Sequence, residues 1–175
     1  MPQVISLPPA PTPGFIPFAP ALGRVVRIVA SAEVPGPPER ASKIILDPRL
    51  MEKWLIGAKG LKADAAWPFF NTSLSWETDD GTEFCEARVI DNHLPEFLKV
   101  DVTTPTHNRV VTHKFTRLEN GGTLYERVVE ADMTGFRKLF GAGRLKSQIK
   151  QEVKRAAGLV VAAPSATPKP SKTAP

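Results

Sequence analysis

Cysteine occurs once among the 175 residues, as Cys85, so an internal disulfide is excluded. A chain without disulfides fits a reducing compartment, although a secreted protein without them has the same composition. The N-terminal segment lacks a basic n-region, and proline interrupts its apolar residues every few positions. The segment therefore matches neither a signal peptide nor a membrane span. A cytoplasmic protein with no integral membrane segment is expected.

The histidines and glycines offer no recognisable cofactor site. No carboxylate or cysteine stands at a metal-ligand spacing from the three histidines, which are His93, His107 and His113. The Gly-Ala-Gly stretch at 141–143 lies inside a helical pattern and matches neither nucleotide-binding fingerprint. We therefore expect no metal and no cofactor. Cys85 is in phase with the apolar side chains of a predicted strand, which favours a small core residue over a nucleophile.

Proline is concentrated near the two ends of the chain. Of the 18 prolines, seven fall in residues 1–20 and four in residues 164–175, and such compositions favour extended or disordered backbone. The 42% hydrophobic and 23% charged residues are ordinary proportions for a globular chain. We predict a Pro-rich N-terminal extension at 1–23, one domain at 24–162 and a disordered Pro-rich tail at 163–175.

The net charge of +5 is compatible with nucleic acid or an anionic membrane as a partner. Residues 137–155, however, hold seven basic residues and one acidic residue. The basic residues occupy the polar side of a helical pattern and are Arg137, Lys138, Arg144, Lys146, Lys150, Lys154 and Arg155. This pattern favours a solvated helix face, so we expect no nucleic-acid partner.

The first part of the domain predicts a strand followed by two short helices. Residues 24–34 alternate apolar and polar side chains, as a half-buried strand does. A proline-rich turn and the apolar residues after it predict a first helix that ends near Leu46. Asp47 can accept hydrogen bonds from the free amides of a second helix, and Pro48, which lacks an amide, suits its first position. The Asp-Pro pair therefore predicts a corner between two helices.

The rest of the domain predicts further strands and a long helix. The expected strands lie at 60–67, in hairpins at 73–90 and 110–133, and at 96–103. Asp-Gly and Asn-Gly-Gly sequences supply the two hairpin turns. Apolar residues from Phe136 to Val160 recur at near-helical spacing, which predicts an amphipathic helix that begins between 134 and 144 and reaches at least 156. Six or seven antiparallel strands curved around this helix make an α+β fold.

This order of elements resembles the START/polyketide-cyclase superfamily, also called SRPBCC, which has a helix-grip fold. The stretch VASAEVPGPPERASKIILDPRLMEKWL is similar to the opening of that family, and FTRLENGGTLYERVVEAD resembles its last hairpin. The resemblance covers residues 24–162 and implies a cavity between the sheet and the helix. It also implies that Trp54 packs at the cavity mouth. Ala41 and Ser42 stand where family members often have Val-Trp, which is a departure in the first helix.

Strand phase directs three polar side chains toward the interior. His113 shares a face with apolar neighbours on one strand, and Tyr125 and Arg127 share a face on the next. For His113 and Tyr125, packing with one hydrogen bond is the simplest interpretation. A buried arginine is costly unless it is paired. Arg127 is therefore expected to meet an internal carboxylate or a polar group of a ligand, or else to extend its stem to the rim.

Three functions fit these observations. The first is binding of a lipid, isoprenoid or polyketide-like molecule in an internal cavity, and the second is a cyclase or dehydratase. The third is an interaction protein acting through its basic helix or its tails, which an interior too bulky for a void would favour. No convincing acid/base pair is visible, which favours binding and leaves catalytic residues unassigned.

The predicted ligand pocket combines residues from several elements. It is bordered by Trp54, Trp76, Val100, His113, Phe115, Tyr125, Arg127, Val129 and Phe140. In this hypothesis, replacing Arg127 with Met changes which ligands bind more than it changes folding.

Overall fold

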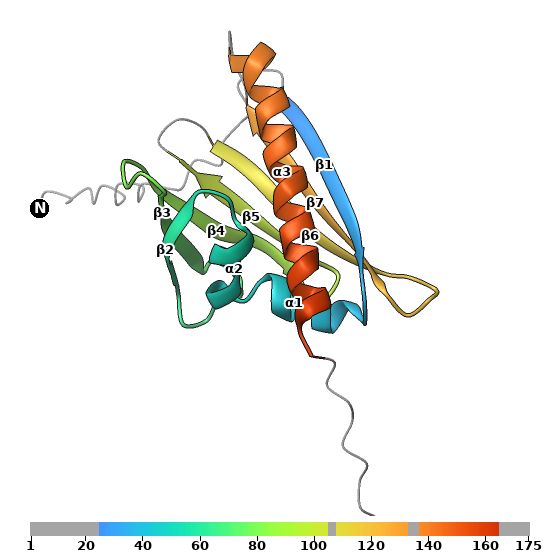
Figure 1. Ribbon diagram of the computed structural model, residues 1–175. Coiled ribbons are helices and arrows are strands. Elements are labelled where there is room, and N and C mark those ends of the chain that lie inside the picture. Colours follow the sequence, from blue (N-terminus) through green and yellow to red (C-terminus); the bar gives the residue numbers. More distant parts are fainter. Residues whose placement is uncertain (1–24, 105–107, 133–136, 165–175) are drawn as a thin grey trace, which may run out of the picture.

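A curved antiparallel sheet forms the larger layer of the molecule (Figure 1). The computed structural model describes residues 25–104, 108–132 and 137–164. In these residues the sheet has seven strands, in the order β1-β7-β6-β5-β4-β3-β2. Their bounds are β1 Val25–Val34, β2 Ala58–Ala63, β3 Ser73–Thr78, β4 Phe84–His93, β5 Phe97–Thr103, β6 Asn108–Arg117 and β7 Thr123–Asp132. The predicted number and antiparallel direction of the strands are confirmed.

Both predicted hairpin turns are present. Between β3 and β4, Gly81 has a φ of +67°, which favours glycine, and the carboxylate of Asp80 accepts hydrogen bonds from the amide and hydroxyl of Thr82. Between β6 and β7, Gly121 has a φ of +80°. There the side-chain oxygen of Asn120 accepts a hydrogen bond from a backbone amide two residues later at 2.9 Å. The residues of these turns therefore help to fix the strand register of both hairpins.

The Asp-Pro sequence forms the predicted corner between α1 (Pro38–Ile45) and α2 (Pro48–Trp54). Asp47 caps α2, because its Oδ1 accepts a hydrogen bond from the amide of Arg49 at 3.0 Å. The guanidinium of Arg49 also pairs with Asp47, and this contact lowers the pKa of the carboxyl group. Pro48 occupies the first helical position, as expected.

The long helix α3 (Arg137–Ala162) lies on the same side of the sheet as α1 and α2 and packs mainly against β1 (Figure 1). Both of its ends fall within the predicted limits. Arg40 of α1 donates hydrogen bonds to the backbone carbonyls of Val160 and Ala163, at 3.1 and 2.7 Å. These bonds attach α1 to the C-terminal end of α3, where carbonyls lack partners inside the helix.

One hydrophobic core fills the space between the sheet and the helices. It contains Cys85, as predicted, and the apolar face of α3. The largest fully buried apolar and aromatic side chains are Trp54, Tyr125, Ile45, Leu74, Leu98 and Ile149. These side chains come from helices and strands alike. Their burial against one another therefore stabilises the packing of the helices on the sheet.

The strand predicted at 60–67 differs most from the observed one, and β4 also runs to His93, beyond the predicted hairpin at 73–90. β2 ends at Ala63, because the chain turns at Asp64, whose carboxylate accepts hydrogen bonds from the amide and hydroxyl of Ser73. The predicted extension at 1–23 lies outside the described residues, as does the predicted tail beyond residue 164. Within the described part of the chain, no helix is long and apolar enough to cross a membrane.

Candidate functional site

The strand registers bring the inward polar residues together. In the β6–β7 pairing, His113 lies opposite Arg127 and Phe115 lies opposite Tyr125. Tyr125 is completely buried, and His113 and Arg127 are 3% and 4% exposed. The interior orientation predicted for His113 and Arg127 is therefore confirmed.

Arg127 is paired with a carboxylate of the long helix. Its Nη1 donates to Oε2 of Glu152, whose side chain is 2% exposed. The other carboxylate oxygen accepts hydrogen bonds from the amide of Ile56 at 3.2 Å and from Nε2 of Gln148 at 3.0 Å. Of the alternatives left open by the sequence, Arg127 thus meets an internal carboxylate. The pair joins β7, α3 and the segment after α2.

Trp54 packs against this pair from the end of α2. The Cζ atom of Arg127 lies 5.2 Å from the centroid of the Trp54 ring, within cation–π range. Nε1 of Trp54 donates to the backbone carbonyl of Ile45 at 3.1 Å, and the side chain is fully buried. The resemblance implied that Trp54 packs at the cavity mouth. This expectation is wrong, because the corner between α1 and α2 turns the side chain into the interior.

His113 and Tyr125 form a second buried pair. Nδ1 of His113 and the hydroxyl of Tyr125 are 2.9 Å apart. Burial, and then the charge of Arg127, lower the pKa of His113 to about 3. Burial raises the pKa of Tyr125. Near neutral pH the imidazole is therefore uncharged and the phenol protonated, so the pair can hold a hydrogen bond but supplies no charged acid or base.

A small void remains beside these side chains. Its volume is about 20 Å³, which is room for roughly one water molecule. Five predicted site residues line it together with aliphatic side chains: Trp54, Trp76, Val100, His113 and Arg127. Nε of Arg127 is buried here without a hydrogen-bond partner among the described residues. The void is much smaller than the roughly 300–1,000 Å³ of typical ligand pockets.

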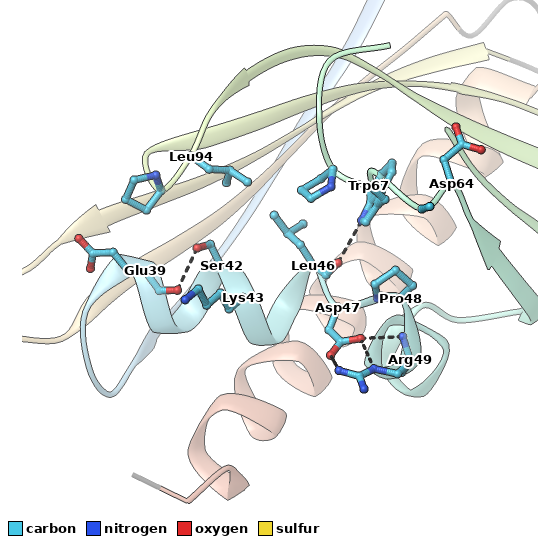
Figure 2. Close-up of a pocket in the computed structure, with 13 residues that line it drawn as sticks. Glu39, Ser42, Lys43, Leu46, Asp47, Pro48, Arg49, Asp64, Trp67 and Leu94 are labelled. Atoms are coloured by element: carbon cyan, nitrogen blue, oxygen red, sulfur yellow. Dashed lines mark hydrogen bonds and ion pairs between the residues drawn. The ribbon is translucent and has the colours of Figure 1, made fainter. Parts of the chain in front are cut away.

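A pocket of ligand size opens at the helix corner, and we call it the mouth pocket. Its volume is about 760 Å³. One wall is α1 with the α1–α2 corner, and the turns at 64–68 and 94–95 form the other (Figure 2). The apolar lining residues are Leu46, Pro48, Ala65, Trp67, Pro68, Leu94 and Pro95, and the polar ones are Glu39, Ser42, Lys43, Asp47, Arg49 and Asp64.

The carboxylates around the mouth pocket have partners within the protein. Asp47 pairs with Arg49 at 2.6 Å, and Glu39 pairs with Arg117 at 3.1 Å. Asp64 accepts the hydrogen bonds of the turn described above. The three carboxylates are therefore engaged within the protein, and the apolar side chains of the lining are left for a ligand.

Trp67 separates the mouth pocket from the inner void. Its side chain lines both spaces and is half-buried. Its Nε1 donates to the backbone carbonyl of Leu46 at 3.0 Å, a contact drawn in Figure 2. This hydrogen bond fastens the turn at 64–68 to the end of α1.

The nine predicted site residues do not form one open pocket. Five line the inner void, Phe115 lines a separate surface hollow, and Tyr125 and Val129 are buried in the packing. Phe140 lies on α3, but its side chain is outside the described residues. None of the nine lines the mouth pocket. Ligand binding by these residues stays a prediction.

Sequence reasoning missed Glu152 as the partner of Arg127. The sequence does contain an indication of this partner. Glu152 is the one acidic residue in the basic stretch 137–155, and it lies beside the apolar Val153. The mouth pocket was also missed, since turns without periodicity form half of it. Among the described residues, no group of three His, Cys, Asp or Glu side chains could hold a metal ion.

Comparisons with known proteins identify the fold. No family model and no curated protein matches the chain. A Rhodobacter sphaeroides protein aligns with a TM-score of 0.64 at 17% identity, over 82% of this chain and 97% of its own. Ara h 8.0201 aligns with a TM-score of 0.61 at 14% identity, over 80% and 100% of the two chains.

A third solved structure is DynU16, described as a putative protein in the dynemicin biosynthetic locus. It aligns with a TM-score of 0.59 at 18% identity, over 75% of this chain and 46% of its own. At these identities the likeness concerns the fold alone. The chain therefore has an α+β helix-grip fold that it shares with these proteins.

Proposed function

We propose that the protein binds an apolar small molecule, of the lipid, isoprenoid or polyketide-like classes, in the mouth pocket. The observation that carries this proposal is a pocket of about 760 Å³ whose lining combines apolar side chains with a few polar ones. Ligand pockets typically have this size and this division of polar and apolar groups. The resemblance to the START/polyketide-cyclase superfamily supports it, as does the occurrence of the fold in a protein from a biosynthetic locus.

In this proposal Trp67 is the side chain that moves to admit larger ligands. The side chain stands between the mouth pocket and the void beside Trp54 and Arg127. Its hydrogen bond to Leu46 contributes only about 1 kcal/mol net, and the partly buried ring also packs against the core. Rotation of Trp67 joins the two spaces and brings a ligand to the interior residues predicted from the sequence.

Fluorescence titration with N-phenyl-1-naphthylamine, an uncharged apolar probe, tests the proposal at low and high salt. Apolar burial is not screened by salt, so the affinity should be similar in both conditions. Ala65→Trp, which fills the mouth pocket, should weaken binding by about tenfold or more, equivalent to roughly 1.4 kcal/mol. Ala63→Trp is the matched control, because Ala63 is also exposed but lies on β2 outside the pocket.

Three results would contradict the proposal. The probe could fail to bind, its binding could disappear at high salt, or the two tryptophan variants could weaken it equally. Far-UV circular dichroism of both variants shows that a loss of binding is not a loss of fold.

A further inference from the structure

The outward side of α3 carries a strongly cationic surface. We call it the α3 cationic face, and its exposed side chains are Arg144, Lys146, Lys150, Lys154 and Arg155. Glu152, the acidic residue of this stretch, points inward and is neutralised by Arg127. Within the part of the chain that the structure describes, none of the five cations makes an ion pair. Among the described residues, no acidic side chain therefore compensates their charge through an ion pair.

Helix geometry arranges these cations in two rows. Lys146, Lys150 and Lys154 follow each other at intervals of four residues, so their attachment points are about 6 Å apart along the axis. Arg144 and Arg155 lie on the other flank, three turns or about 17 Å apart. Because successive residues of an α-helix are about 100° apart around its axis, the two rows border the exposed side of α3, a helix that lies in the outer layer of the molecule (Figure 1).

We propose that the α3 cationic face docks on the surface of an anionic phospholipid bilayer. Two rows of cations along the exposed side of one helix can lie on a flat charged surface, and each Lys or Arg near such a surface strengthens binding by about fivefold. Single-stranded nucleic acids are instead held in positively charged grooves with aromatic side chains for base stacking. The five cations line none of the pockets described above, and the described side chains of α3 include no aromatic residue. The bilayer is the partner that this shape fits.

The test is co-sedimentation of the full chain with vesicles. Phosphatidylcholine vesicles with and without roughly 30% phosphatidylglycerol are compared at low and high salt. The phosphatidylglycerol gives the vesicles a negative surface charge like that of an anionic leaflet. The protein should bind only the anionic vesicles and should be released by salt. Lys150→Gln with Lys154→Gln should weaken binding by about 25-fold, since two cations are lost.

A control variant removes equal charge elsewhere. Lys62→Gln with Lys114→Gln also removes two exposed cations, but these lie on β2 and β6. This variant should weaken vesicle binding much less, through net charge alone. Equal losses in the two double variants, or no binding to anionic vesicles, would overturn the proposal. Tighter binding of a single-stranded or duplex oligonucleotide than of the vesicles, measured by fluorescence anisotropy, would overturn it as well.

Discussion

Replacing Arg127 with Met should destabilise the protein by about 3–5 kcal/mol, because it leaves a buried charge without its partner. The carboxylate of Glu152 is 2% exposed in the native protein, and without Arg127 it would keep only the hydrogen bonds from Ile56 and Gln148. A domain of this size is stable by about 5–15 kcal/mol in total. The structure therefore revises the expectation from sequence that this substitution alters ligand preference more than folding.

Removing the charges of both Arg127 and Glu152 should lower the free energy of unfolding less than removing either charge alone. In Arg127→Met with Glu152→Leu both charges of this pair are absent, and the main loss is the acceptor for Ile56 and Gln148, worth about 1–3 kcal/mol. Glu152→Leu alone leaves the guanidinium unpaired beside Trp54 and should cost about 3–5 kcal/mol. The coupling between the two sites should therefore be at least about 3 kcal/mol.

Urea unfolding followed by tryptophan fluorescence measures all of these variants. Arg27→Met is the control, since Arg27 and Glu130 form an exposed pair at 3.6 Å on the sheet. That substitution should cost at most about 1 kcal/mol. If Arg127→Met lowers the free energy of unfolding no more than Arg27→Met does, Arg127 and Glu152 do not form a costly buried ion pair. The same conclusion follows if the loss in the double variant equals the sum of the losses in the two single variants.

Two further predictions concern single side chains. The folded protein keeps His113 neutral down to a pKa of about 3, whereas the unfolded chain protonates near 6.5, so the unfolding free energy should fall by up to about 1.4 kcal/mol per pH unit below pH 6.5. His113→Gln should flatten this slope in urea titrations at several pH values, and an unchanged slope would argue against a neutral buried imidazole. Asp47→Ala should cost about 1 kcal/mol in thermal unfolding because the cap of α2 is lost. Asp47→Asn should cost less, and an equal cost would show that the cap contributes nothing.

The elements predicted from sequence are those whose local chemistry agrees with their packing. Asp47 caps its helix through atoms two residues away, and the two hairpin turns depend on residues within each turn. Alternation along β6 and β7 predicted the burial of His113 and Arg127, because one face of the sheet packs on helices. Such features need no information from distant parts of the chain.

The site needed information that no local pattern contains. Arg127 and Glu152 are 25 positions apart and meet only when α3 crosses the sheet. The hydrogen bond from Trp67 to Leu46 depends on how the turn at 64–68 returns to α1. The alternation of side chains along the strands indicated which of them point inward. It could not indicate that these side chains fill the interior and that the larger pocket lies at the α1–α2 corner.

Arg40 makes the mouth pocket and α3 mechanically interdependent. A shift of α3 along its axis by about 1 Å would lengthen the 2.7 Å bond to Ala163 beyond hydrogen-bonding range or carry α1 with it. α1 supplies Ser42 and Lys43 to the pocket wall. Thermodynamic linkage is reciprocal, so a partner that shifts α3 and a molecule held in the pocket would change each other's affinity by the same factor.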